Sequence, residues 1–341
     1  MKGINLTANQ LNVATFVGID AHPDSHTALA VNRFKEPKGH LTFANTTAGI
    51  VEFQAWLTAL QAQSETIIIG VEGGSTARTA LLKSILGRQS FLFEVNPLYT
   101  KHKRSFGTKG DKTDLADAKL IAGVLTTELE DLPRITPGQV SSHMLRLKKA
   151  VWFYEEVTSQ GARLQNQLHK LRREHKLTQD RLEKQLLAEI ITSREKELSL
   201  IRKTKTGLEK RLQTLFPGSG MNLTGIRGIG LITAARIVAH SGGIERFHNR
   251  DAYVRYSGIS PLARSSGKTN FFVKANRGNR KLNSVFYYAA LCRIVHSQEA
   301  KQLYLRKVAS GKTKKAAIVY LMRKTAILAY SMLKSGEAYR G

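Results

Sequence analysis

The sequence predicts an α/β domain at the N-terminus, a long helical segment in the middle and a mainly α domain at the C-terminus. Two apolar runs, at 15–20 and 66–72, are rich in β-branched residues, which is typical of buried central strands. From about 141 to 216 the chain has no proline and almost no glycine. We therefore divide the chain into a lead-in at 1–13, the α/β domain at 14–135, the helical segment at 141–216 and the C-terminal domain at 217–341.

The order of elements in the first domain narrows its fold. We expect, in order, strands at 15–20, 27–31 and 40–44, a helix capped at 45–47 that runs to about Leu60, a strand at 66–72, a helix from Ser75 to about Leu86, a strand at 91–95 and an acidic helix that begins near Thr113. Three antiparallel strands, then βαβ units, then an acidic helix is the order of a ribonuclease H-like fold.

Four acidic residues stand where these elements end or begin. Asp20 closes the first strand and Glu72 the fourth, while Asp114 and Asp117 share one face of the acidic helix because they are three residues apart. Acids at the carboxyl edge of a sheet lie where α/β proteins place their ligands. Four converging carboxylates would repel one another without a cation, and oxygen ligands suit Mg²⁺ or Mn²⁺. The alternative is that each acid separately caps or solvates the end of its element.

The charge of the chain points to a polyanionic partner. Its formal net charge is +27, an excess that predicts salt-sensitive binding to nucleic acid, although a ribosomal-type structural protein would also carry such a charge. One cysteine, Cys292, excludes a disulfide framework and a cysteine-rich zinc site. We find no secretory signal, and no stretch approaches the length of a membrane span. We therefore expect a cytoplasmic, nucleoid-associated protein.

The helical segment repeats apolar residues at alternating spacings of four and three. Leu164, Leu168 and Leu171 show this spacing first. A second set follows it, made of Ile191, Leu198, Ile201, Leu208, Leu212 and Leu215. The pattern predicts two long helices in a hairpin or coiled coil, with self-association into a dimer or tetramer as its use. The alternative is a helical bundle within one chain.

The C-terminal domain opens with a glycine-rich turn. Gly225–Gly230 has the pattern GIRGIG and precedes an apolar helix expected at 231–239, which is typical of a helix-hairpin-helix motif. There Arg227, Gly228 and Gly230 would let backbone amides approach a phosphate at a helix N-terminus. Tight helix packing is the other explanation of these glycines.

Further basic residues lie in turns before expected helices. They are Lys101, Lys103 and Arg104 in the loop before the acidic helix, and Lys268, Lys274, Arg277, Arg280 and Lys281 before a helix at 282–295, with a last basic helix at 312–334. They fit a nucleic-acid-binding surface, or else are solvated loops. The GKT at 267–269 is not a phosphate-binding loop, because Leu262 stands where that motif needs glycine.

In their order and spacing, these motifs resemble the insertion-sequence transposases of the family numbered one hundred and ten, which includes the Piv and MooV site-specific recombinases. The resemblance runs nearly end to end. It rests on GID at 18–20, FANTT at 43–47, Glu72, NP at 96–97, KTDLADA at 112–118, GIRGIG at 225–230, SGISP and SSGKT within 257–269, and RK followed by AYSMLKSG within 323–336.

The resemblance implies a RuvC-like DEDD domain joined by a coiled coil to a C-terminal transposase domain. In that family an acidic tetrad, here Asp20, Glu72, Asp114 and Asp117, acts with a serine, here Ser266. It implies a DNA transposase or recombinase that uses Mg²⁺ or Mn²⁺ to cut and rejoin donor and target DNA. For the newer members it implies a guide RNA encoded by the element itself.

Three other functions are weighed against this one. A Holliday-junction endonuclease of the same fold would use metal-activated water and would not need Ser266. An actin-like kinase would need a glycine-rich turn after the first strand, where this chain has Asp20-Ala-His-Pro. A DNA-binding protein without catalysis would leave the four acids without a role.

Overall fold

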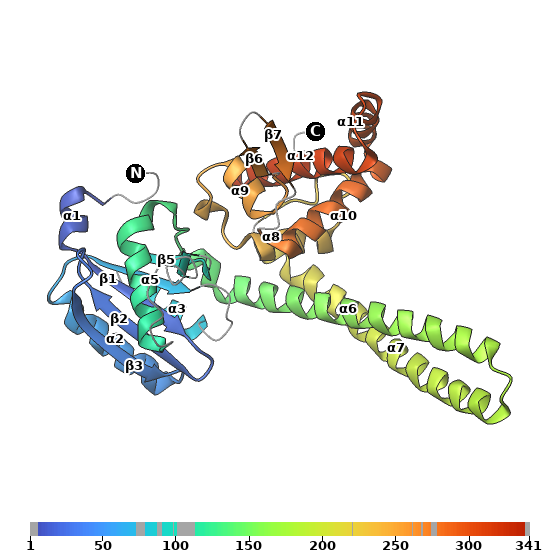
Figure 1. The fold of residues 1–341 in the computed structure, drawn as a ribbon, viewed down its shortest axis with the longest axis horizontal. Coiled ribbons are helices and arrows are strands. Elements are labelled where there is room, and N and C mark those ends of the chain that lie inside the picture. Colours follow the sequence, from blue (N-terminus) through green and yellow to red (C-terminus); the bar gives the residue numbers. More distant parts are fainter. Residues whose placement is uncertain are drawn as a thin grey trace. The chain divides into compact units, whose positions relative to one another are not determined.

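The computed structural model describes residues 6–72, 79–86, 91–97, 99–100, 113–219, 221–260, 262–266, 269–273 and 278–337. The chain divides into two compact units, and each is described by itself (Figure 1). Unit 1 comprises residues 1–141 with 245–248, and unit 2 comprises residues 142–244 and 249–341.

Unit 1 is built on one mixed sheet of five strands in the order β3-β2-β1-β4-β5 (Figure 1). The strands are β1 (Thr15–Ala21), β2 (Ser25–Val31), β3 (Pro37–Ala44), β4 (Ile67–Glu72) and β5 (Phe91–Val95). β2 runs antiparallel to both β1 and β3, whereas β1, β4 and β5 are parallel. The predicted α/β character of this part of the chain is confirmed.

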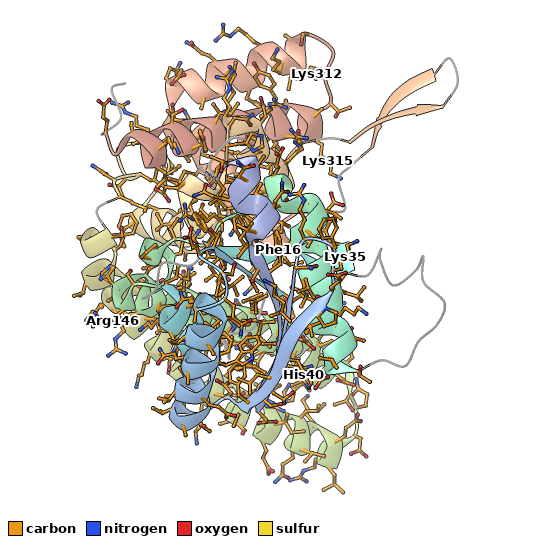
Figure 2. All side chains as sticks on the ribbon, turned by 90° about the vertical axis from the view of Figure 1, so that its left-hand side faces the viewer. Phe16, Lys35, His40, Arg146, Lys312 and Lys315 are labelled. Atoms are coloured by element: carbon orange, nitrogen blue, oxygen red, sulfur yellow. The ribbon has the colours of Figure 1, made fainter. Side chains whose placement is uncertain are left out.

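Helices cover both faces of this sheet. On one face α2 (Thr47–Gln61) and α3 (Thr79–Leu86) bury a core that includes Val17, Phe53 and Ile69. On the other face α5 (Asp114–Glu128) packs on Phe16 and Ile68; Figure 2 labels Phe16 on its strand. Unit 1 also contains η2 (Leu129–Asp131) and η3 (Pro137–Val140).

The lead-in differs from its prediction. Residues 1–13 were expected to be a loose segment, but α1 (Ala8–Val13) is a helix. Thr7 begins it with a capping box, because its hydroxyl accepts from the backbone N–H of Gln10 while the Gln10 side chain accepts from the backbone N–H of Thr7.

α5 lies unusually close to the sheet because two glycines face it. Gly18 of β1 pairs with Gly70 of β4 in the parallel register. A Cβ atom on Gly18 would lie 2.2 Å from the carbonyl oxygen of Ala118, and one on Gly70 would lie 2.9 Å from the Leu125 side chain. Because glycine has no side chain, the backbone of α5 can lie directly against β1 and β4 at these two positions.

Unit 2 begins with a hairpin of two long helices, α6 (Ser142–Leu177) and α7 (Arg181–Leu215), which lie along one another (Figure 1). Asp180 caps α7 by accepting a hydrogen bond from the backbone N–H of Glu183 at 2.7 Å. The predicted heptad positions meet within this one chain, since Leu164, Leu168 and Leu198 form a buried cluster. Leu208 and Leu212 are buried as well.

The rest of unit 2 is mainly helical. It contains η4 (Pro217–Ser219), α8 (Leu231–Ser241), η5 (Ile244–Arg246, two residues of which belong to unit 1), α9 (Arg250–Tyr256), β6 (Leu262–Ser266), β7 (Thr269–Val273), α10 (Arg280–His296), α11 (Gln298–Ala309) and α12 (Lys314–Ser335). Two features differ from the sequence prediction. The serine segment forms an antiparallel hairpin rather than an open loop, and the described residues 221–230 before α8 form turns without a helix of their own.

α12 also corrects one expectation. Among the described residues it is the one helix that is long and apolar enough to meet the length and composition criterion for a membrane span, although no such stretch was expected. Half of its apolar window is buried inside the protein, as in a core helix.

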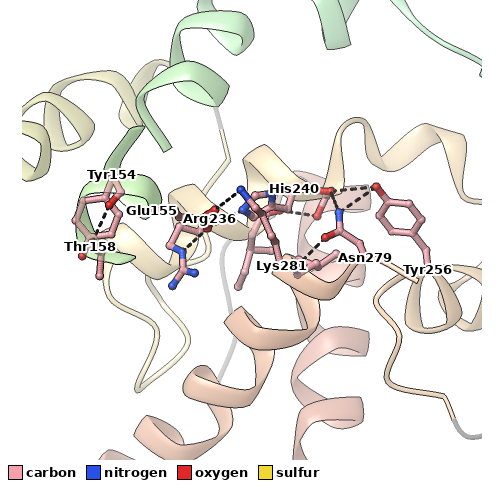
Figure 3. A network of polar contacts seen from close by, with 11 residues as sticks. Tyr154, Glu155, Thr158, Arg236, His240, Tyr256, Asn279 and Lys281 are labelled. Carbon is pink, nitrogen blue, oxygen red and sulfur yellow. Dashed lines mark hydrogen bonds and ion pairs between the residues drawn. The ribbon is translucent and has the colours of Figure 1, made fainter. Parts of the chain in front are cut away.

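A partly buried carboxylate joins three helices of unit 2 (Figure 3). Glu155 of α6 accepts a hydrogen bond from Arg236 at 2.9 Å and contacts Nε2 of His240 at 2.8 Å, both on α8. Its second oxygen lies 3.2 Å from Nζ of Lys281 on α10. Burial alone would raise the pKa of Glu155, but His240 and Arg236 outweigh it and lower this pKa to about 2.

Replacing Gly18 tests the close contact of helix and strand. Because Gly18→Ala places a carbon against the backbone of α5, we expect the free energy of unfolding in urea to fall by about 1–3 kcal/mol. Gly123→Ala is the control, since no atom lies within 4 Å of its added Cβ. A helix alanine there should raise stability by up to about 1 kcal/mol. Equal effects of the two changes would contradict the contact.

Replacing Glu155 tests the polar network. Glu155→Gln leaves nearby cations without their counter-charge, so we expect unit 2 to lose about 2 kcal/mol or more of unfolding free energy. Because the pKa is lowered in the fold, this stabilisation is present above the ordinary value of 4.5 and is lost as the pH falls toward 2. The adjacent Glu156→Gln is the control. Its exposed pair with Arg163 predicts a change within about 0.5 kcal/mol.

Candidate metal centre

The four predicted acids lie where three elements of unit 1 meet. Asp20 and Glu72 stand two residues beyond the paired glycines of β1 and β4, so the alternation of a strand puts both on the face that α5 covers. Asp114 and Asp117 occupy the first turn of α5, which Thr113 caps by accepting a hydrogen bond from Ala116 N–H at 3.2 Å.

A histidine that the sequence analysis did not single out lies between two of these acids. Nε2 of His22 is 3.5 Å from Oδ2 of Asp20 and 3.8 Å from Oδ1 of Asp114. The three side chains each offer one ligand atom, and these atoms lie within 4.8 Å of one another. Its position two residues after Asp20, at the end of a strand, was the signal that could have identified His22.

The electrostatics of Asp20 show that the other three acids act on its carboxyl. Burial raises the pKa of the Asp20 carboxyl. The neighbouring charge of His22 lowers it, while the carboxylates of Asp117, Glu72 and Asp114 raise it further. A carboxyl with this pKa direction is destabilised as an anion and would gain from a cation.

The donor set fits a divalent metal ion. Oδ2 of Asp20 is buried and has no hydrogen-bond partner among the residues that the structure describes. Glu72 is oriented by the hydroxyl of Thr100, which donates to its Oε1 at 3.1 Å. Carboxylate oxygens suit Mg²⁺, and one imidazole nitrogen beside them also suits Mn²⁺. Asp20, Glu72, Asp114 and Asp117, with His22 beside them, would hold such an ion.

Ser266 belongs to unit 2. It is the last residue of β6, and its backbone pairs with Thr269 across the turn of the β6–β7 hairpin. The four acids all belong to unit 1. The structure thus describes the backbone position of the predicted nucleophile within its own unit.

The predicted nucleic-acid-binding residues fall into two groups. Six of them lie outside the described residues, namely Lys101, Lys103, Arg104, Lys268, Lys274 and Arg277. Of the others, Arg227 and Arg280 are exposed, and Gly230 is the N-cap of α8.

Gly228 and Lys281 have structural partners. Gly228 has φ +88°, and a Cβ there would lie 2.8 Å from the Arg293 backbone on α10, so helix packing accounts for this glycine. Lys281, whose side chain is largely exposed, is paired with the partly buried Glu155. Both residues therefore have contacts within unit 2, and their role in binding nucleic acid stays a prediction.

Two family models match the chain. A transposase model of the DEDD type named for IS110 matches residues 17–177, and the model of the transposase IS116/IS110/IS902 family matches residues 221–305. The first match begins inside β1 and includes the rest of the five-stranded sheet, α5 and all of α6, and the second covers the turn before α8 and the β6–β7 hairpin.

Several individual proteins of insertion elements are also similar in sequence to this chain. The chain is 26% identical over 153 residues, 44% of its length, to the "Insertion element IS110 uncharacterized 43.6 kDa protein" of Streptomyces coelicolor. It is 28% identical over 119 residues, 34% of its length, to the "Transposase for insertion sequence element IS1111A" of Coxiella burnetii. These matches span 38% and 33% of the relatives' own lengths. A match of 23% identity to the "Pilin gene-inverting protein" of Moraxella bovis covers 95% of the chain and 97% of that relative.

Divalent metal ions test the acidic cluster without any assay of activity. Because a cation would offset the repulsion at Asp20, we expect Mg²⁺ or Mn²⁺ to raise the melting temperature, by mass action on the folded state. Asp20→Asn removes a destabilised anion, so it should melt higher than the parent in a chelator and gain little from metal.

The control for this experiment is Asp24→Asn, an exposed acid four residues away. It should keep the full response to metal. An Asp20→Asn protein that still gains as much from metal as the parent would show that the ion binds elsewhere.

Proposed function

Because the chain belongs to the IS110 family of insertion-sequence transposases, we propose that it cuts and rejoins DNA strands with the help of divalent metal ions. The observation that carries this proposal is that His22 and Asp114 lie beside the buried Asp20, whose carboxyl is also influenced by the charges of Glu72 and Asp117. We also propose that unit 1 is a RuvC-like, ribonuclease H-like domain. The sheet order and the position of the acidic helix support this.

In the proposed mechanism, Asp20, Glu72, Asp114 and Asp117 would hold a divalent metal ion, which would supply charge stabilisation for the phosphate chemistry when bound. The hydroxyl oxygen of Ser266 attacks phosphorus, so that a serine–phosphate ester forms and the bond to the leaving strand's oxygen breaks. The serine proton passes to water, and the leaving strand takes up a proton as a free hydroxyl. Attack by the hydroxyl of the exchanged strand then releases Ser266.

The proposed partners are donor and target DNA. The net charge of +27 supports binding to a polyanion, and it would equally serve an RNA encoded by the element, which we include in the proposal as the guide. One relative is named as a transposase and another as a protein that inverts a pilin gene, so the proposed strand exchange could lead to insertion or to inversion. Cutting and rejoining are common to both.

We further propose that the chain acts as a dimer or tetramer. The leucines of the heptad pattern are used inside the hairpin, so they do not support association between copies. A different stripe of α7 supports association between copies, because the apolar side chains of Leu182, Leu186 and Ile190 are exposed at successive turns of the helix.

A junction endonuclease is the second candidate, because the acidic cluster would serve it equally well. In that reaction a metal-activated water attacks the phosphate, and the cut leaves no bond between protein and DNA. The two candidates therefore differ in the role of Ser266.

Substitution of Ser266 separates these reactions. If serine attacks, Ser266→Ala should lose strand cleavage, and the parent should form a covalent protein–DNA species that survives denaturant. Ser265→Ala is the matched control and should retain most activity. Asp114→Ala should lose cleavage in either reaction while keeping DNA binding. Cleavage by Ser266→Ala at the parent's rate, with free phosphate ends, would overturn the serine mechanism and favour the endonuclease.

A further inference from the structure

Two adjacent aromatic side chains on α6 face solvent. Trp152 is 58% exposed and Phe153 is 43% exposed. Their ring centroids are 6.4 Å apart, and the ring planes are inclined by only 26°. Large aromatic side chains usually lie in the core. An exposed, nearly parallel pair of rings therefore indicates a binding surface for another molecule.

The same face of α6 carries positive charge. Lys149 is exposed and lies three and four residues before the two rings, which puts it beside both of them. Arg146 lies one turn earlier and is also exposed (Figure 2). The neighbouring acid, Glu156, is paired with Arg163 at 3.5 Å. The rings are thus flanked by cations that have no acidic partner among the described residues.

This turn of α6 is held firmly on its other side. Val151 is fully buried, and Glu155 is bound to two residues of α8 and one of α10 (Figure 3). Tyr154 donates a hydrogen bond to Glu209 of α7 at 3.4 Å. The aromatic pair therefore projects from a fixed helix, so little conformational entropy is lost when a partner binds to it.

We propose that Trp152 and Phe153 form a stacking surface for unpaired bases of single-stranded DNA, with Lys149 and Arg146 beside the phosphates. Bases in a duplex are stacked on their neighbours and offer no free face, whereas an unpaired base can stack on an exposed ring. A second copy of this chain docking through the same face is a poorer occupant, because this face is basic and would meet its own charge.

This inference rests on the proposed function for the source of the unpaired strand. When strands are exchanged between duplexes, nucleotides next to the cut must leave their pairing partners. A surface that binds bases without reading their sequence would hold such a segment.

The chain offers a direct spectroscopic test, because it has only two tryptophans. Trp56, half-buried on α2, can be changed to phenylalanine so that Trp152 is the one reporter. We expect a dT oligonucleotide to quench the Trp152 fluorescence to saturation and a duplex of similar length to quench it much less. Phe153→Leu in this background should weaken binding about tenfold, as expected for loss of base stacking.

Matched variants complete the experiment, with binding measured by anisotropy of a labelled oligonucleotide. Trp152→Leu keeps an apolar side chain but should lose affinity about tenfold, whereas Trp152→Phe should retain most of it. Leu200→Ala removes another exposed apolar side chain of the hairpin and should have no effect. Lys149→Ala should reduce the dependence of affinity on salt concentration.

Three outcomes would overturn the inference. They are equal quenching by duplex and single strand, full affinity in Trp152→Leu, and binding of an RNA oligonucleotide at least tenfold more tightly than DNA of the same sequence. A change in oligomeric state in Trp152→Leu, with unaltered DNA affinity, would assign the surface to a second copy instead. Loss of cleavage in Asp114→Ala is measured separately from binding of the oligonucleotide, so failure of this inference and failure of the proposed function give different results.

Discussion

The close contact between α5 and β1 is the constraint on which the candidate metal centre depends. Helices normally stand off a sheet by the thickness of side chains, and at that distance the first turn of α5 would not reach the end of β1. Gly18 and Gly70 remove those side chains at adjacent positions. The apolar face of α5 then packs on the sheet through residues such as Ile121 and Leu125. Burial of that face supplies the free energy that holds the repelling carboxylates together.

The pKa values of Asp20 and Glu155 shift in opposite directions, although burial alone would raise both. Glu155 has cationic partners on two helices, and its pKa is lowered to about 2. The pKa of Asp20 is raised by its burial first, and the neighbouring carboxylates of Asp117, Glu72 and Asp114 raise it further against the opposing effect of His22. The first arrangement is complete within the protein and stabilises the packing of unit 2. The second lacks a compensating positive charge of comparable strength, so a bound cation would stabilise it.

The sequence predicted most of unit 1 and the four acids because both depend on local patterns. The strand Phe91–Val95 and the helix cap at Thr46 were found at their predicted positions. The roles of Gly228 and Lys281 depend on partners far away in the chain, Arg293 and Glu155, which no local pattern reveals.

The features that the sequence did not predict also depend on contacts between particular residues. α1 depends on a reciprocal pair of hydrogen bonds between Thr7 and Gln10. The β6–β7 hairpin depends on pairing between two short strands whose polar residues resemble a loop. His22 was overlooked because its position two residues after Asp20 is a weak signal in the sequence alone, and only the structure places Asp114 beside it.

Charge alone cannot direct a strand-exchange reaction. Contacts to phosphates position a protein on any nucleic acid. A net charge of +27 favours many such contacts, with no preference for paired or unpaired strands. Discrimination requires groups that contact the bases themselves. The exposed rings of Trp152 and Phe153 are suited to this because they can stack only on a base that has left its duplex. In this view the acidic centre of unit 1 supplies the chemistry, while aromatic residues of unit 2 distinguish the strand that has opened from the duplex around it.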